Sequence, residues 1–478
     1  MTTSAAFNNL PGPPPMRFVG WRGNMIQFFR DPIGYMAPLA ERYGHLVAFS
    51  KGGNGPVLIR DAKFGPVFAL GPESVQPVWT QMSAFHLTRV PGPRDSQSFQ
   101  RITGGLFSMN DDKHRQQRKL LQPAFHKNRV DGYQGAMVEM AERVLSGWRV
   151  GEVRDMAKEM THLTLGVANK TLFGMEPTQG ELSLGEKIQN IVTLSMSPST
   201  LIPLNLPFTP RRRLIQLSEA MEADLRAVIA RKRTEGLHQN DVLTTLLQTR
   251  DEDGGALTDE ELIGQLFLLF FAGHDTTKSA LCWTLFLLSQ HPDCLQKLQT
   301  ELSQTLRGSP PKPEQMGQLV YLDRVIKESL RLFTPAPFAV RITVAPTSIC
   351  GVDLPIGTEV IASPYCLHRN PKVFAEPLRF WPDRWEKLNP SPFEYAPFGA
   401  GPRMCLGAGF ATLELKIVLS MLLQRFTPDM PGGVPLHRKT MIVLSPAGGL
   451  PMLLKAPGDP LSRRRIDGNV REMVTLPE

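Results

Sequence analysis

The segment FGAGPRMCLGAG, residues 398–409, constrains the fold more than any other part of the chain. Its only cysteine, Cys405, lies among glycines and precedes ATLELKIVLSMLLQRF, an apolar run with helical character. Glycines let a backbone approach a flat group closely, and the first turn of the following helix would point N–H groups at the sulfur. Arg403 adds positive charge nearby. All three features favour a thiolate held at a fixed place in the fold.

Three uses of Cys405 are open at this point. A buried cysteine is most often a small apolar side chain. A nucleophilic cysteine needs a nearby histidine or acidic base, and the sequence around residue 405 offers none. A metal bound through one thiolate needs no such base, and haem with a cysteine as its proximal ligand fits the pattern. We therefore expect a haem-thiolate site, with a cysteine hydrolase as a remote alternative.

A helix about 45–50 Å long is predicted between Thr258 and the segment SQHP at 289–292. Thr258 and Glu261 have the spacing of a capping box, and no proline interrupts the run that follows. A helix of this length crosses a whole domain.

Polar residues interrupt the apolar middle of this helix in the segment AGHDTT, which contains Asp275 and Thr276. Polar groups in such surroundings are costly unless they are bonded or used. A threonine hydroxyl can bond the carbonyl four residues earlier and loosen the helix, and an adjacent acid can pass protons inward from water. The pair predicts a proton path, and the alternative is a cap on a broken helix.

Glu328 and Arg331 are spaced i, i+3 on the next predicted helix, so they share a face and can form an ion pair. Most such pairs are exposed and contribute little to stability. Arg384, in the segment WPDRW shortly before the cysteine loop, is a second arginine that could complete a buried Glu-Arg-Arg lock.

The whole chain, residues 1–478, is predicted to be one mainly α domain with small β-sheets (α+β), because no linker or repeat divides it. The Pro-rich start, residues 1–15, and the polar tail, residues 459–478, are expected to be loosely ordered. The loop at 196–213, which is apolar and Pro-rich, is expected to be a lid or a membrane-touching surface. Further expected elements are a helix at 31–44, strands at 45–50 and 56–60, a helix at 314–333 and a strand-and-turn region at 339–363.

Charge and cysteine usage narrow the class of protein. Lys and Arg number 53 against 45 Asp and Glu, a net charge of +8 that suits an acidic partner or an anionic surface. The short arginine clusters lack the stacking aromatics of a nucleic-acid site. Five widely spaced cysteines without a C-x-x-C pair indicate a reducing compartment and no zinc site. We find no transmembrane anchor and expect a soluble, cytoplasmic protein, monomeric by default.

The chain resembles the cytochrome P-450 superfamily, in its soluble bacterial-type form, along nearly its whole length. The cysteine signature of that family is met by Phe398, Gly401, Arg403, Cys405 and Gly407. Its Glu-x-x-Arg pair and its acid–threonine pair also occur, in the family's order. The resemblance implies a long central helix over haem b, with the iron bound by a cysteine loop.

Residue roles follow from the same resemblance. Cys405 is then the metal ligand, and Asp275 and Thr276 are the catalytic residues. The residues expected to contact the haem are Cys405, His114, Arg118, Arg341, Phe398, Arg403, Gly407 and Ala272. Four of them form a clamp for the haem propionates: His114, where tryptophan is common, Arg118, Arg341 and Arg403. The residues expected to line the substrate pocket are Phe107, Phe267, Phe271, Phe338, Val340 and Ala447.

The activity that the resemblance implies is insertion of one oxygen atom from dioxygen into a hydrophobic small molecule such as a fatty acid, terpenoid or steroid-like compound. Electrons would come from a ferredoxin- or flavodoxin-type partner, since the chain contains no flavin or dinucleotide fingerprint. Lys113, Arg115 and Lys119 are candidates for docking that partner. The alternatives are a haem-binding sensor or electron carrier of the same fold, and a peroxide-driven enzyme or isomerase, whose branches usually lack the acid–threonine pair.

Overall fold

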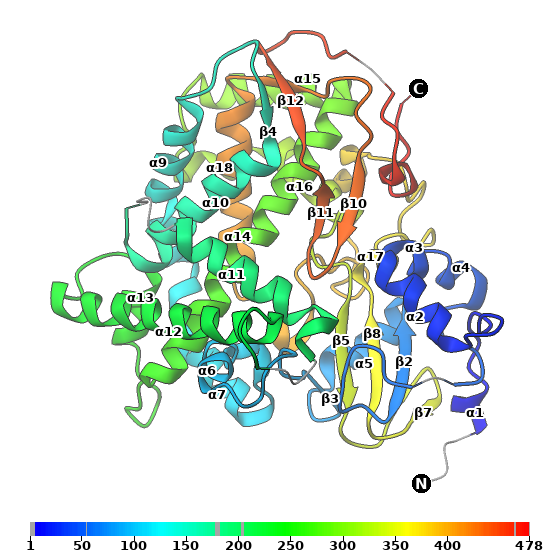
Figure 1. Cartoon of the computed structure of the whole chain (residues 1–478). Helices are drawn as coiled ribbons and strands as arrows, with labels where there is room; N and C mark the ends of the chain where they lie inside the picture. The colour runs from blue at the N-terminus through cyan, green and yellow to red at the C-terminus, as the bar shows by residue number, and fades with distance from the viewer. Residues whose placement is uncertain (1–4, 54, 177–181, 202–204, 463–464, 478) are drawn as a thin grey trace.

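The computed structural model describes residues 5–53, 55–176, 182–201, 205–462 and 465–477. It shows a large helical body with smaller sheets beside it (Figure 1), which is the α+β class expected from the sequence. The α-helices are α1 (Ala5–Asn8), α2 (Trp21–Arg30), α3 (Pro32–Met36), α4 (Leu39–Tyr43), α5 (Pro72–Thr80), α6 (Gln97–Ile102), α7 (Asp111–Leu121), α8 (Lys127–Gly132), α9 (Gln134–Leu145), α10 (Met156–Phe173), α11 (Leu182–Ser195), α12 (Pro210–Glu235), α13 (Val242–Gln248), α14 (Asp259–Gln290), α15 (Pro292–Leu306), α16 (Val320–Leu332), α17 (Pro364–Leu367) and α18 (Ala408–Leu423). The strands are β1 (Leu46–Ala48), β2 (Phe64–Ala69), β3 (Phe85–His86), β4 (Val153–Asp155), β5 (Ala339–Thr343), β6 (Thr347–Ile349), β7 (Val352–Leu354), β8 (Thr358–Ala362), β9 (Thr427–Asp429), β10 (His437–Thr440), β11 (Leu444–Ala447) and β12 (Pro451–Lys455).

The long helix predicted from the capping box is α14, which has 32 residues. Thr258 accepts a hydrogen bond from the backbone N–H of Glu261 at 3.3 Å, and its own N–H donates to the Glu261 carboxylate at 3.1 Å. α14 runs through the middle of the molecule (Figure 1) and packs against α10, α12, α16 and α18. Its residues from Ala280 to Leu288 are buried on every side, so α14 is the centre of the core.

A five-stranded sheet of order β1-β2-β8-β5-β3 forms a lobe beside the helical body, at the lower right of Figure 1. β2 and β8 pair in parallel, whereas β8 and β5 pair antiparallel. β5 carries Val340 and Arg341, and the hairpin of β10 and β11 packs against α14. The sheet lobe and the hairpin therefore bring expected site residues to the side of the central helix.

Three local predictions were wrong. The strand expected at 56–60 does not form, because the N–H groups of residues 57–59 bond the side chain of Glu359 and β1 pairs instead with β2. The helix expected at 31–44 is divided into α3 and α4 at Pro38, which has no N–H to continue α3. The helix expected at 314–333 begins only at Val320.

Both ends of the chain contact the rest of the fold. Leu10 is buried, and the carbonyl of Pro11 accepts a hydrogen bond from Ala48 at 2.8 Å. In the tail, Arg438 reaches across to donate to the carbonyl of Asn469 at 2.6 Å. The buried apolar side chains in the described part of the tail are Ile466, Val470, Met473, Val474 and Leu476. These side chains pack in the main core, and the expected looseness of the two ends stays a prediction.

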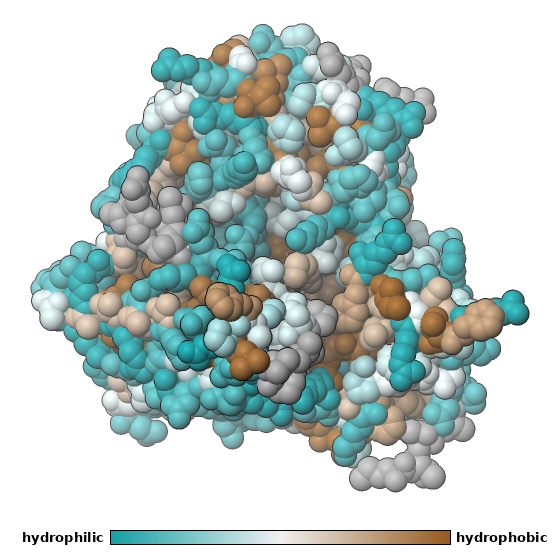
Figure 2. All heavy atoms as spheres, in the orientation of Figure 1, coloured by the Kyte–Doolittle hydropathy of each residue, from teal (hydrophilic) through white to brown (hydrophobic). Residues whose placement is uncertain are grey.

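Within the part of the chain that the structure describes, no helix is both long and apolar enough to cross a bilayer. Figure 2 shows a mostly hydrophilic surface, with hydrophobic residues gathered in the hollow between the helical body and the sheet lobe. In the loop expected at 196–213, residues 202–204 lie outside the described residues. Leu206 and Phe208 are exposed, and α12 begins directly after them at Pro210.

Candidate functional site

The cysteine loop makes tight turns before it enters α18. Gly399 and Gly401 have φ angles of 70° and 72°, which residues with a Cβ rarely adopt. A Cβ at Gly401 would also collide with the carbonyl of Trp79. The N–H of Cys405 donates to the carbonyl of Phe398 at 2.8 Å and closes the loop. The sulfur is thereby held at the N-terminal end of α18, as the sequence predicted.

Cys405 lines a large cavity, and its side chain is exposed to that space. Burial raises the pKa of this thiol, whereas the N–H of Gly407 and the charge of Arg118 act in the opposite direction. The charge of Arg118 near the sulfur was not predicted from the sequence, which pointed to Arg403. Arg403 donates to residues 109–110 at 2.6 and 2.8 Å, and its action on the sulfur stays a prediction.

The four residues of the expected clamp, His114, Arg118, Arg341 and Arg403, all line this cavity. Among the described residues, Nδ1 of His114 and the Nε atoms of Arg341 and Arg403 are buried without a hydrogen-bond partner. Burial lowers the pKa of Arg341 and of Arg403 to about 10. Burial and the charges of the three arginines lower the pKa of His114 to about 4. Unpaired buried cations are costly, so this cluster fits a ligand that brings carboxylates, as haem does.

Glycines on two walls of the cavity leave room for a flat group. A Cβ at Gly273 on α14, or at Gly399 or Gly407 in the cysteine loop, would meet no heavy atom within 4 Å. Ala272 and Phe398, which the resemblance assigns to the haem, line the same cavity. A thiol, small residues on both sides and arginines without carboxylate partners together fit a haem between α14 and the loop.

Thr276 and Asp275 of α14 lie in different surroundings. Thr276 lines the cavity, and its hydroxyl donates to the carbonyl of Ala272 at 2.7 Å, the back-bond expected from the sequence. Asp275 does not line the cavity, because its carboxylate pairs with Lys278. The sequence analysis missed Lys278, although its i, i+3 spacing from Asp275 was readable. α14 continues through this region, so the alternative of a broken helix is wrong.

The cavity has a volume of about 2030 Å³ and mostly apolar walls. Of the side chains expected there, Phe107, Phe271, Phe338 and Val340 do line it. Phe267 does not, because it lies one turn nearer the start of α14 and is packed in the core. Ala447 does not either, because it is paired with His437 inside the β10–β11 hairpin, whose turn at 440–443 reaches the cavity instead.

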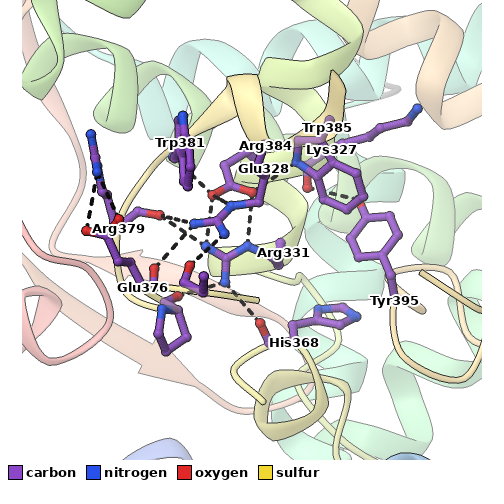
Figure 3. A network of polar contacts seen from close by, with 12 residues as sticks. Lys327, Glu328, Arg331, His368, Glu376, Arg379, Trp381, Arg384, Trp385 and Tyr395 are labelled. Carbon is purple, nitrogen blue, oxygen red and sulfur yellow. Dashed lines mark hydrogen bonds and ion pairs between the residues drawn. The ribbon is translucent and has the colours of Figure 1, made fainter. Parts of the chain in front are cut away.

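Glu328, Arg331 and Arg384 form the buried lock that the sequence suggested (Figure 3). Arg331 donates to the two carboxylate oxygens of Glu328 at 3.0 and 2.9 Å, and Arg384 donates to one of them at 3.0 Å. The indole N–H of Trp385 donates to the other at 2.9 Å. The lock fastens the segment 368–385 to α16, and this segment leads into the cysteine loop.

The sequence analysis also missed Glu414 on α18. This side chain is buried, lines the cavity and leaves Oε1 without a hydrogen-bond partner among the described residues. Burial raises its pKa well above the ordinary value of a carboxyl. The available signal was an acid within an otherwise apolar helix.

The basic residues proposed for partner docking each have an acidic neighbour. The pairs are Lys113–Glu261 at 3.9 Å, Lys119–Glu252 at 3.0 Å and Arg115–Asp112. The three basic side chains are mostly exposed, so these pairs are weak and do not prevent contact with a partner.

A mainly helical protein whose cysteine loop, glycine walls and unpaired arginines surround one cavity belongs to the class of haem-thiolate proteins. Comparison with known proteins agrees. The chain belongs to the cytochrome P450 family, whose profile matches residues 11–451.

Several curated relatives come from Streptomyces. Cyclooctatin synthase of Streptomyces melanosporofaciens is 30% identical, with 90% of this chain and 93% of the relative covered. Cyclooctat-9-en-7-ol 5-monooxygenase of the same organism is 29% identical, over 84% of this chain and 86% of the relative. Pentalenene oxygenase of Streptomyces avermitilis is 29% identical, over 84% and 88%.

Family membership makes the protein an oxidoreductase that incorporates oxygen from dioxygen, with haem b bound through a cysteine thiolate and electrons from a separate partner. Haem, when bound, supplies the activation of dioxygen. The residues described above fit that cofactor, because the chain offers a sulfur ligand, cationic partners for the carboxylates and walls without obstructing side chains.

Proposed function

We propose that this chain is a monooxygenase of hydrophobic small molecules and that its substrate is a terpenoid. The observation that carries the proposal is the apolar wall of the cavity next to Cys405, formed by side chains such as Phe107, Phe271 and Phe338. The relatives named cyclooctat-9-en-7-ol 5-monooxygenase, cyclooctatin synthase and pentalenene oxygenase favour terpenoids over fatty acids and steroids.

In this proposal Cys405 is the iron ligand, and His114, Arg118, Arg341 and Arg403 hold the propionates. The haem propionates would pair with the positive charges of these clamp residues. Next to Cys405 a substrate would then meet mostly apolar side chains, which disfavours strongly ionic molecules on desolvation grounds.

Thr276 and Asp275 are proposed to manage protons. The hydroxyl hydrogen of Thr276 is engaged by the Ala272 carbonyl, so the oxygen presents its lone pairs to the cavity as an acceptor. The carboxylate of Asp275, in contact with Lys278 on its outer side, is the group that can receive a proton from solvent. Thr276 then holds a donor, such as water, at its Oγ1 atom in the cavity.

Replacing Thr276 with alanine is expected to lower the product formed per electron pair by about 100-fold or more, because a positioned proton-transfer group contributes about 10²–10⁴-fold. Electron consumption continues and hydrogen peroxide accumulates. Thr277→Ala is the matched control, because Thr277 also lines the cavity and makes the same back-bond, to Gly273 at 2.9 Å. Equal coupling of product to electrons in Thr276→Ala and the wild type would remove Thr276 from this role.

A ligand screen by the spin-state shift of the ferric protein tests the substrate class. A diterpene alcohol, a saturated fatty acid and a steroid are titrated separately, and the diterpene alcohol is expected to give a saturable shift at the lowest concentration. A tighter response to the fatty acid or the steroid would overturn the terpenoid assignment. A protein that oxidises no ligand from any class while cycling electrons would instead be a carrier or sensor.

An acidic ferredoxin or flavodoxin is the proposed electron donor, with α7 as its docking face. This proposal rests on the exposed basic side chains of α7 and on the net charge of +8. The cytoplasmic location expected from cysteine usage stays a prediction.

A further inference from the structure

One buried carboxylate holds a loop at the rim of the cavity. Successive backbone N–H groups of Val57, Leu58 and Ile59 all donate to Glu359, the first two at 3.0 and 2.9 Å. Glu359 is fully buried, and no cation pairs with it among the described residues. Three consecutive N–H groups aimed at one anion form a compact anion-binding nest. The side chain of Glu359 therefore stabilises one conformation of this loop.

The loop lies where the cavity meets solvent. Residues 56–61 line the cavity, and within them Pro56, Arg60 and Asp61 are exposed. Phe29 on α2 is 55% exposed and also lines the cavity. Residues 56–61 are therefore part of the mouth, which we call the rim loop.

Glu359 connects the rim loop to the part of the sheet that carries the haem clamp. It lies in β8 opposite Ile342 of β5, and the neighbouring pair in the same register is Arg341 with Val360. A shift of the rim loop would have to break three hydrogen bonds to the buried carboxylate of this sheet. The mouth is consequently anchored to the same sheet that positions one propionate arginine.

Across the mouth, an exposed ion pair connects the rim loop to the segment that carries Arg94. Asp61 pairs with Arg94, which also lines the cavity, but both side chains are about two-thirds exposed, at 66% and 69%. Exposed ion pairs of this kind contribute little. The bonds to Glu359, together with the packing of Val57, Leu58 and Ile59 against the core, therefore hold the rim loop more firmly than the outer pair does.

We propose that Glu359 is a positioning residue that holds the rim loop as the fixed edge of the cavity mouth and so limits access by ligand size. The inference rests on the proposed use of this cavity as the substrate pocket, but it does not depend on the substrate being a terpenoid. Small ligands pass the mouth whether or not the edge is fixed. Bulky ligands require the edge to move, so Glu359 controls their rate of access.

The test uses the haem-loaded protein and two probes that bind haem iron through an azole nitrogen, imidazole and a bulky triaryl-substituted imidazole. Their association rates are measured by stopped-flow absorption in wild type and Glu359→Gln. An amide turns an N–H donor toward the nest and leaves a backbone donor of the loop unpaired. The bulky probe is expected to bind roughly tenfold faster, the factor for losing one buried hydrogen bond, while the imidazole rate stays within about twofold.

Glu73→Gln is the matched control, since this exposed carboxylate on α5 pairs with His45 at 3.3 Å away from the rim loop. It should leave both rates unchanged. Equal rate changes for the two probes, or no change for either, would overturn the proposal, because a general loss of stability affects both alike.

Hydrogen exchange of the wild-type protein gives an independent readout if Glu359→Gln fails to fold. The peptide covering residues 57–59 should exchange as slowly as β8 itself. Fast exchange there would contradict the proposal directly. Because azoles bind the haem whatever the natural substrate is, failure of the terpenoid assignment leaves this result interpretable.

Discussion

The Cys405→Ser variant is expected to lose the long-wavelength Soret band that the reduced, carbon monoxide-bound protein should show, together with all measurable product formation. A serine hydroxyl stays protonated at neutral pH, so it cannot donate the electron density that a thiolate gives to haem iron. The substitution preserves size, and the N–H of residue 405 can still donate to Phe398. The loop therefore keeps its shape while the ligand changes.

The control for this prediction is Cys350→Ser, which exchanges the same atoms at an exposed turn between β6 and β7. That variant should keep both the band and the activity. Haem content is measured in each protein, and we expect the serine variant at 405 to retain haem through the clamp of His114, Arg118 and the other arginines. Persistence of the long-wavelength band in Cys405→Ser would show that another residue ligates the iron.

Local chemistry explains which features were predictable from sequence. The capping box of Thr258 and Glu261 and the i, i+3 pair of Glu328 and Arg331 are written into neighbouring residues, and the structure contains both. The cysteine loop was equally readable, because its glycines are required by the positive φ angles at Gly399 and Gly401 and by the close approach of Trp79 to the latter.

Features that depend on distant partners were not predictable. Residues 56–60 have the composition of a strand, but a carboxylate about 300 positions away captures their N–H groups. The charge of Arg118 comes near the sulfur because α7, far from Cys405 in the sequence, packs against the cysteine loop, where Arg118 donates to the carbonyl of Met404 at 2.8 Å. Phe267 and Phe271 differ by one turn of one helix, yet only the packing of neighbouring elements decides which of them meets the cavity.

The Arg331→Ala variant is expected to lower the free energy of unfolding by about 3–5 kcal/mol, the usual cost of removing one partner from a buried ion pair. The guanidinium makes two bonds to Glu328 and three to the carbonyls of residues 368, 377 and 379. Removing it leaves Glu328 with Arg384 as its only cationic partner in Figure 3, takes the side-chain donor from the carbonyls of residues 368 and 377, and leaves the carbonyl of Arg379 with Arg384 alone. Since folded domains are stable by only about 5–15 kcal/mol, a large part of the stability is lost.

Two further variants separate the geometry of the lock from its charge. Arg331→Lys keeps the charge but replaces the planar five-donor group with a single ammonium, so we expect most of the loss to remain. Arg324→Ala, on the same helix α16, removes a pair with Glu386 at the surface and should cost no more than about 1 kcal/mol.

Urea unfolding, followed by tryptophan fluorescence, measures the free energy of unfolding of all three variants. Haem retention is recorded in parallel, because the segment 368–385 leads to the cysteine loop. An Arg331→Ala protein as stable as Arg324→Ala would mean that the lock does not hold this segment in place. A lysine variant as stable as the wild type would mean that the charge alone suffices.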